Sequence, residues 1–282
     1  MVSLSLSRLS PSESAELIKQ VTGGKALPKE IADQIVGRTD GVPLFIEELT
    51  KSVVESGLLT EAGDHYALAK PIAASELAIP TTLHASLLAR LDRLPSAREV
   101  AQIGATIGRQ FSHELISTVA NLPQRQVEEA LAQLVNAELL LSSGMPLDAQ
   151  YTFKHALVQD AAYQTILRSK RQDYHLQIAH VLEEQFPDIA EAEPHTMAHH
   201  YTEANLGRSA ITYWRKAGEK AAQRSANVEA VRHFDKGLGL LKAIPESPER
   251  LQEELGMLLA LGTPLIATKY AGPVLIRLGC SS

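Results

Sequence analysis

Residues 37–49 read Gly37-Arg38-Thr39-Asp40-Gly41-Val42-Pro43-Leu44-Phe45-Ile46-Glu47-Glu48-Leu49. Gly41 tolerates φ > 0 just past a helix end, and Pro43 suits the first turn of the helix that follows. Apolar residues recur at helical spacing on both sides of this corner, while charged ones largely occupy another side of the second helix. The apolar set is Ile31, Ile35, Val36, Leu44, Phe45, Leu49, Val53 and Val54; the charged set is Glu47, Glu48 and Lys51. The stretch therefore predicts two helices joined by a rigid corner.

Composition narrows the class of protein. The 282 residues are 45% hydrophobic and only 5% aromatic, which favours packed helical layers over sheets. A net charge of −6 gives no general reason to expect a nucleic-acid partner. The chain has one cysteine, Cys280, and no apolar run near the ~20 residues that span a bilayer. We therefore expect a cytoplasmic protein without a membrane segment.

The N-terminal region predicts a strand followed by a helical domain. Residues 1–9 alternate apolar and polar side chains, as in a strand, although a loosely docked start fits them too. Ser10, Pro11 and Glu13 form a capping box at the start of the next helix. We expect three helices over residues 10–59, then a linker over 60–80 that contains a short strand at 65–68.

Residues 81–157 have the pattern of a winged helix. Leucines at helical spacing run from Leu83 to Leu94, and a second stripe runs from Val100 to Phe111. A short helix at 114–119 and a longer one near 124–139 follow, and then two short apolar runs around a turn predict a β-hairpin.

Many winged helices bind DNA, so that function is one alternative. The expected third helix carries Arg125 against Glu128, Glu129 and Glu138. An acidic helix is repelled by the phosphate backbone instead of gaining from counterion release. A packing domain is the favoured interpretation.

Residues 158–282 predict helical repeats of the tetratricopeptide type. Small residues alternate with large ones along two helices, and Ala230 and Phe234 give the Ala-x-x-x-Phe signature of a second repeat helix. Pro248 opens a further helix, and residues 271–282 depart from the pattern. Such repeats commonly bind protein partners. The fold class is therefore mainly α, with a helical lid, a winged-helix-like domain and helical repeats.

Histidines are the remaining candidate site residues. His155 lies where the predicted wing ends and a helix begins, a position typical of a cap or a core residue. His195 and His199 share a helix face at a spacing that can hold zinc, but no Glu follows His195 as in His-Glu-x-x-His enzymes. We expect no metal site there.

No catalytic motif is present in the sequence. Gly23-Gly24-Lys25 is the nearest match to a phosphate loop, but Lys19 and Ala26 break the pattern. The chain also has no Gly-x-Ser-x-Gly elbow. We expect no enzymatic activity from this chain alone.

Two strings resemble a known family. Thr39–Leu49 and Phe153–Tyr163 are similar to the lid corner and the end of the winged helix in bacterial STAND-type signalling ATPases associated with class III adenylate/guanylate cyclases. The resemblance implies that Gly41 and Pro43 lie at the adenine nucleotide and that His155 contacts a phosphate of ADP. Ala156 stands where many relatives have Asp, so only His155 is carried over from that motif.

The resemblance implies a regulatory and protein-interaction role in cyclic-nucleotide signalling. The strand at 1–9 would be the last strand of a nucleotide-binding sheet that these residues do not contain. ATP or ADP with Mg²⁺ would be cofactors of a parent protein and not of this chain alone. Partners would be that nucleotide domain, a cyclase domain, and proteins bound by the repeats. The alternatives are a helical scaffold that ignores nucleotide and, less favoured, a DNA-binding regulator.

Overall fold

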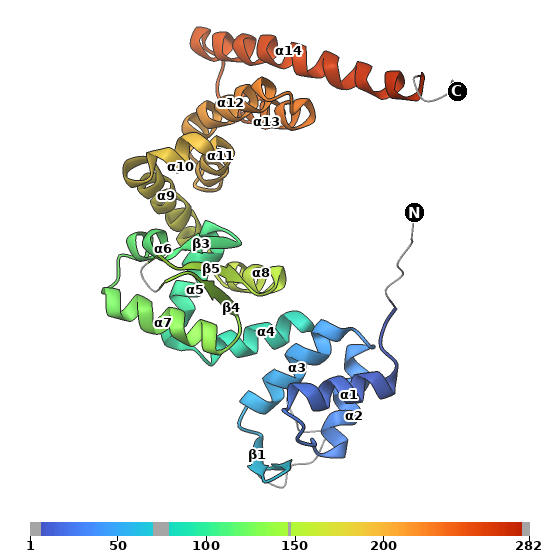
Figure 1. Cartoon of the computed structure of the whole chain (residues 1–282). Helices are drawn as coiled ribbons and strands as arrows, with labels where there is room; N and C mark the ends of the chain where they lie inside the picture. Colours follow the sequence, from blue (N-terminus) through green and yellow to red (C-terminus); the bar gives the residue numbers. More distant parts are fainter. Residues whose placement is uncertain (1–6, 70–78, 146–147, 278–282) are drawn as a thin grey trace. The chain divides into compact units, whose positions relative to one another are not determined.

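The computed structural model describes residues 7–69, 79–145 and 148–277, and side chains as far as Lys269. The chain divides into two compact units, Met1–Thr165 and Ile166–Ser282. The fold is mainly α with two small antiparallel sheets, as expected (Figure 1). The strand expected at residues 1–9 falls mostly outside the described residues.

Three helices begin the first unit: α1 (Pro11–Val21), α2 (Lys29–Thr39) and α3 (Pro43–Glu55). The capping box predicted at Ser10 and Glu13 is present. The helices surround a core of buried aliphatic side chains that includes Ile18, Ile31, Ile35, Ile46, Leu49 and Val53. Ile31, Ile35, Leu49 and Val53 belong to the apolar set found in the sequence, and Ile18 and Ile46 add to it. Amphipathic packing therefore accounts for the three-helix arrangement.

A hairpin follows where the sequence predicted a linker. Strands β1 (Leu59–Ala62) and β2 (His65–Leu68) pair antiparallel, with Leu59 opposite Leu68. Leu59 and Ile79 are buried in the same core as the helices. The strand expected at 65–68 is thus confirmed. However, residues 59–68 belong to the packed helical domain, because the hairpin supplies side chains to its core.

The winged-helix arrangement is formed by α4 (Leu83–Asp92), α5 (Pro95–Ile107), β3 (Gln110–Ser112), α6 (His113–Ala120), α7 (Gln124–Asn136), β4 (Leu140–Ser143) and β5 (Gln150–Phe153). Its sheet has the order β3-β5-β4, antiparallel throughout. The expected hairpin is therefore confirmed, and α8 (Ala156–Gln164) packs on α4 and α5.

The prediction for Phe111 was wrong. The sequence pattern placed it on a helical stripe, but α5 ends at Ile107 and Phe111 lies on β3 opposite Tyr151. Its ring fills the space beside Gly104, where a Cβ would lie 2.7 Å from the ring. A buried aromatic side chain can fall at helical spacing from its neighbours and still belong to a strand, because helices and strands both bury such side chains.

The second unit contains α9 (Arg168–Gln185), α10 (Pro187–Ala192), α11 (Pro194–Glu203), α12 (Gly207–Gln223), α13 (Asn227–Leu241) and α14 (Pro248–Arg277). Its core gathers Ile211, Ala221, Ala230, Phe234, Leu241, Met257 and Leu261. The expected boundary at 157/158 differs from the division at 165/166 by one helix, because α8 packs within the first unit.

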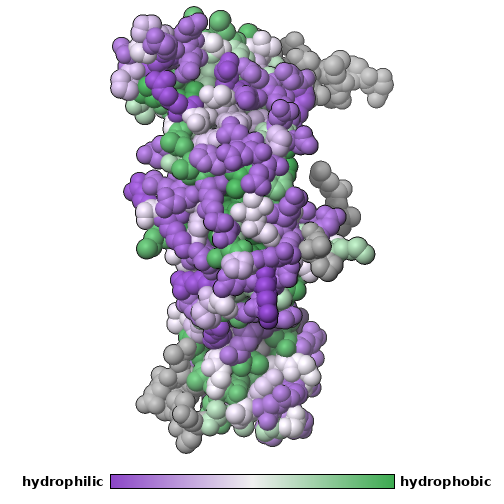
Figure 2. All heavy atoms as spheres, turned by 90° about the vertical axis from the view of Figure 1, so that its left-hand side faces the viewer, coloured by the Kyte–Doolittle hydropathy of each residue, from purple (hydrophilic) through white to green (hydrophobic). Residues whose placement is uncertain are grey.

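Polar residues predominate on the face drawn in Figure 2, where hydrophobic ones form separate small areas. Within the described residues, no helix has both the length and the apolarity needed to cross a bilayer.

Candidate functional site

The corner between α2 and α3 is fixed by close backbone contact. Asp40 and Gly41 both have positive φ, 48° and 68°. The Leu9 N–H donates to the Gly41 carbonyl oxygen at 2.8 Å, and a Cβ on Gly41 would overlap the Leu9 carbonyl oxygen. Only glycine therefore fits here. Pro43 starts α3 as predicted and is exposed, as is Val42.

His155 lies directly before α8, at its N-cap position. Its backbone is extended (φ −133°, ψ 143°), and its side chain does not cap the helix. The Nε2 atom is buried and has no hydrogen-bond partner among the described residues. A buried polar nitrogen without a partner calls for an explanation, and the same holds for other buried atoms of the described residues, such as Thr50 Oγ1 and His113 Nε2.

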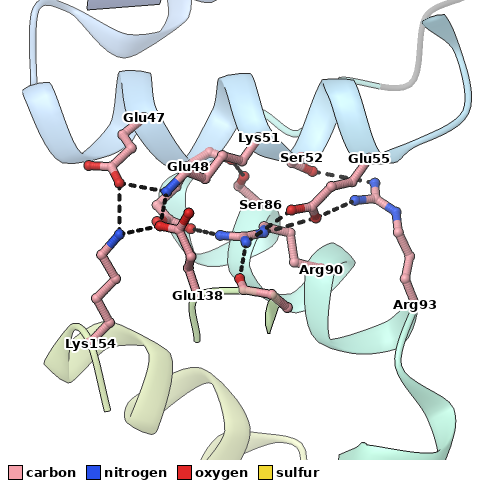
Figure 3. Close-up of polar contacts among 11 residues, drawn as sticks. Glu47, Glu48, Lys51, Ser52, Glu55, Ser86, Arg90, Arg93, Glu138 and Lys154 are labelled. Atoms are coloured by element: carbon pink, nitrogen blue, oxygen red, sulfur yellow. Dashed lines mark hydrogen bonds and ion pairs between the residues drawn. The ribbon is translucent and has the colours of Figure 1, made fainter. Parts of the chain in front are cut away.

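Four alternating charges connect α3 to the residues around the wing (Figure 3). Lys51 Nζ lies 2.7 Å from both Glu47 Oε1 and Glu138 Oε2. Lys154 Nζ lies 3.0 Å from Glu47 Oε1 and 2.6 Å from Glu138 Oε2. We call these four residues the charge square. Each charge has two opposite partners, so the square is a closed network and not a single ion pair.

Hydrogen bonds within the square shift the pKa values of Glu138 and Lys154. Hydrogen bonds from Lys154 and Lys51 lower the pKa of Glu138 to about 2. Partial burial opposes the charge on Lys154, but hydrogen bonds to Glu138 and Glu47 outweigh this effect and raise the pKa of Lys154. The hydrogen bonds of the square thus favour the ionised forms of Glu138 and Lys154.

A second, buried network lies beside the square and centres on Arg90 of α4. Arg90 pairs with Glu48, and both side chains are only 1% exposed. Its Nε and Nη2 atoms each lie 3.0 Å from a carboxylate oxygen of Glu55, and Nη2 also donates to the Ala137 carbonyl oxygen. The Ser86 hydroxyl donates to the Glu48 carbonyl oxygen at 3.0 Å. Burial disfavours the Arg90 charge, yet Glu48 and Glu55 outweigh it and raise the pKa of Arg90.

An ion pair of the charge square connects the segment that contains Pro43 to the segment that contains His155. Pro43 lies one helical turn before Glu47, and His155 directly follows Lys154. The Glu47–Lys154 pair thus links the segment of Pro43 to that of His155. The sequence did not reveal this link, and it was wrong in one respect: Glu48 was placed with the polar side of α3 but is buried.

Five histidines of the second unit lie in two groups. His175 and His200 are buried with their Nδ1 atoms 2.8 Å apart, and burial lowers the pKa of each to about 3. His199 contacts His175 edge-on and is tilted against His200, whereas His195 stacks on His233. Among the described residues, no group of three or more potential ligands could hold a metal ion.

Helix α7 exposes acidic residues, whereas the corresponding surface of DNA-binding winged helices is basic. Arg125 of α7 is paired with Glu129 at 2.7 Å, so its charge is compensated within the same helix. Glu128 and Glu129 are both exposed. This arrangement disfavours contact with a phosphate backbone.

Two comparisons bear on the chain. A family model described as a domain of unknown function, DUF8739, matches residues 10–65, which include α1 to α3. The chain is also similar to the uncharacterized protein R02095 of Rhizobium meliloti (strain 1021), with 29% identity over 244 residues. That alignment covers 86% of this chain but only 23% of the relative.

Proposed function

We propose that this chain is the regulatory and protein-interaction part of a STAND-type signalling ATPase associated with cyclic-nucleotide signalling in the cytoplasm. The lid helices and the winged helix close over ADP or ATP held by a nucleotide domain that these residues do not contain. The helical repeats recruit a protein partner, and a cyclase domain is the output in a parent protein. The chain by itself is not an enzyme.

The unpartnered Nε2 of His155 is the observation that carries the proposal. A buried imidazole nitrogen loses its hydrogen bonds to water and gains none from the described protein. A phosphate oxygen of ADP would supply the missing partner. Pro43, exposed at the corner, would contact the adenine part of the same nucleotide.

The charge square gives this arrangement a physical basis. The Lys154 N–H donates to the Leu139 carbonyl oxygen at 3.1 Å, which holds the backbone immediately before His155, and the Lys154 side chain pairs with Glu47 and Glu138. The lid corner and the wing are thereby joined before nucleotide arrives, so little ordering is required on binding. A nucleotide can shift the protein between closed and open states only through its different affinity for the two.

The relative's length fits a role within a larger protein. The chain spans 23% of R02095, so the matched segment there is one part of a much longer polypeptide. No phosphate-loop motif occurs in these 282 residues. Phosphate binding and the Mg²⁺ ion are therefore assigned to the parent protein's nucleotide domain.

Isothermal titration tests this division of roles. The chain alone should bind neither ADP nor ATP at micromolar concentrations. A chimera in which this chain replaces the aligned segment of R02095 should bind ADP, because the proposal assigns that longer protein a nucleotide domain. Micromolar binding by the chain alone would contradict the assignment of the phosphate site.

Variants of the chimera distinguish a chain that contacts the nucleotide from a nucleotide-independent scaffold. Pro43→Ala and His155→Ala should each weaken ADP binding, whereas Leu157→Ala, an exposed change on the same turn as His155, should not. Equal ADP affinity in all variants would make the chain a nucleotide-independent scaffold. A chimera that binds no nucleotide would contradict the nucleotide domain that the proposal assigns to the longer protein. Tight, salt-sensitive binding of duplex DNA would instead favour a DNA-binding regulator.

A further inference from the structure

A cavity of about 350 Å³ lies between α7 and the β4–β5 hairpin of the winged-helix arrangement. Helix α7 packs there against β4 and α6 (Figure 1). Pockets of this volume that combine apolar walls with a few polar groups commonly bind small molecules. The lining includes His113 from α6, Glu128, Leu131, Ala132 and Val135 from α7, and Tyr151 from β5. Neither Pro43 nor His155 lines this cavity, so it is a separate site.

The buried end of the cavity is marked by His113, which is only 6% exposed. Its backbone begins α6, and its N–H donates to the Ala149 carbonyl oxygen at 2.8 Å. The start of the helix thus accounts for the backbone but not for the imidazole. The Nε2 atom is buried and has no hydrogen-bond partner among the described residues. Because His113 lines the cavity, a molecule bound there can supply the missing partner.

The outer end of the cavity carries a negative charge. Glu128 is exposed, and its Oε1 atom accepts a hydrogen bond from Gln124 Nε2 at 2.8 Å. Arg125, the nearest cation along α7, pairs with Glu129 instead. Among the described residues, no lysine or arginine lines the cavity. The Glu128 carboxylate therefore favours a cation at this end and disfavours a phosphate group.

The charge of Glu128 extends to an aromatic wall. Burial and the Glu128 carboxylate together raise the pKa of Tyr151. The Tyr151 ring is stacked on Phe111 with the ring centroids 5.9 Å apart, which holds it in place. Leu131 and Val135, four residues apart on α7, supply aliphatic surface to the same cavity. A flat aromatic body is the shape that such walls accommodate.

We propose that this cavity binds a small aromatic amine that carries a hydroxyl group on its ring, of the tyramine type. The hydroxyl group pairs with His113 Nε2 at the buried end. The aromatic ring lies against Tyr151 and Leu131, and the ammonium group pairs with Glu128 at the outer end. This site goes beyond the proposed function and does not depend on nucleotide.

Three probes of similar size test the chemistry of the site. Each is titrated into the full chain and followed by saturation-transfer NMR. Tyramine should bind saturably, with a dissociation constant below about 1 mM. Phenethylamine, which lacks the hydroxyl group, should bind about tenfold more weakly. 4-Hydroxyphenylacetate, whose charge is opposite, should bind at least about a hundredfold more weakly.

Variants of the lining locate the site. Glu128→Gln should weaken tyramine binding at least about tenfold, whereas Glu129→Gln, the adjacent exposed glutamate outside the lining, should not change it. Ala132→Leu should also weaken binding, because the larger side chain fills the cavity from an exposed position. His113→Phe keeps a ring but removes Nε2, so it should abolish the preference for tyramine over phenethylamine.

Circular dichroism checks that each variant is folded. Glu128→Gln and Ala132→Leu alter exposed residues, so the test stands even if His113→Phe does not fold. Absence of saturable tyramine binding would overturn the proposal, and so would equal affinity for the three probes. Tyramine affinity that neither Glu128→Gln nor Ala132→Leu reduces would overturn it too. These results leave the ADP experiment unaffected, so the two proposals fail separately.

Discussion

At the residue scale, Gly41 shows how one missing Cβ fixes the corner. Its positive φ strains any other residue, and the Leu9 carbonyl oxygen occupies the space that a side chain would need. The first effect is worth about 1–2 kcal/mol and the second about 1–3 kcal/mol.

Gly41→Ala should therefore lower the free energy of unfolding of the first unit by about 2–5 kcal/mol. Gly37→Ala is the matched control, because Gly37 lies inside α2 with open space around it. That change should stabilise the helix by roughly 0.5–1 kcal/mol. Urea unfolding followed by circular dichroism measures both, and equal effects would contradict the account of the corner.

The charge square predicts an acid-sensitive contribution of Glu138. The pKa of Glu138 is about 2 in the folded protein against an ordinary value of 4.5, because Lys154 and Lys51 hydrogen-bond to the ionised form. A lowered pKa stabilises the fold above pH 4.5, and this stabilisation is lost as the pH falls from 4.5 toward 2. Glu138 is more than half exposed, so solvent and salt weaken the effect.

Urea midpoints of the wild type and Glu138→Gln should differ most near neutral pH and converge as the pH falls below the ordinary pKa of glutamate. One molar NaCl should shrink the difference, because a Debye length of about 3 Å screens the square. A difference that stays constant from neutral to acid pH would exclude Glu138 as the titrating group.

At the element scale, the joint between α3 and α4 depends on the buried Arg90–Glu48 pair. Removing one partner leaves a buried charge, at a cost of about 3–5 kcal/mol, whereas replacing both by apolar residues is often nearly neutral. Glu48→Leu should thus destabilise strongly, and Glu48→Leu with Arg90→Met should recover part of the loss. Glu47→Ala, in the more exposed square, should cost about 0–1 kcal/mol. A double-mutant cycle without coupling would contradict this account.

Much of the element order could be predicted from the sequence. The capping box at Ser10, the proline at the start of α3 and the hairpin before His155 are local signals, and each is present in the structure. Phe111 was misplaced because strand β3 is short and is defined by its distant partner β5.

The site was less predictable than the element order, because its contacts join residues that are far apart in the sequence. Gly41, Pro43 and His155 were found through local motifs, and their roles toward nucleotide stay predictions. The networks that join them depend on pairs such as Glu47–Lys154 and Glu48–Arg90, which are far apart in sequence. No periodicity records such pairings, although the two glutamates of α3 that pair with arginines at the C-terminal end of α4 offered a hint through their opposite charge.

At the scale of the whole molecule, each unit has its own hydrophobic core. Trp214 is the single tryptophan and belongs to the second unit, so its fluorescence reports that unit. Phe234→Ala should lower the Trp214 unfolding midpoint, with a loss of about 3–5 kcal/mol. Ile35→Ala, in the first core, should leave this midpoint unchanged while shifting the circular dichroism transition. A matching shift in both signals for Ile35→Ala would contradict separate cores.

The dissociation rate of ADP from the R02095 chimera tests the central claim most directly. If His155 Nε2 binds a phosphate oxygen, His155→Ala removes a hydrogen bond to a charged group, worth about 1.5–3 kcal/mol. Stopped-flow release of a fluorescent ADP analogue should then accelerate roughly ten- to a hundredfold. An unchanged rate, with Leu157→Ala as the control, would contradict the claim that His155 holds the nucleotide.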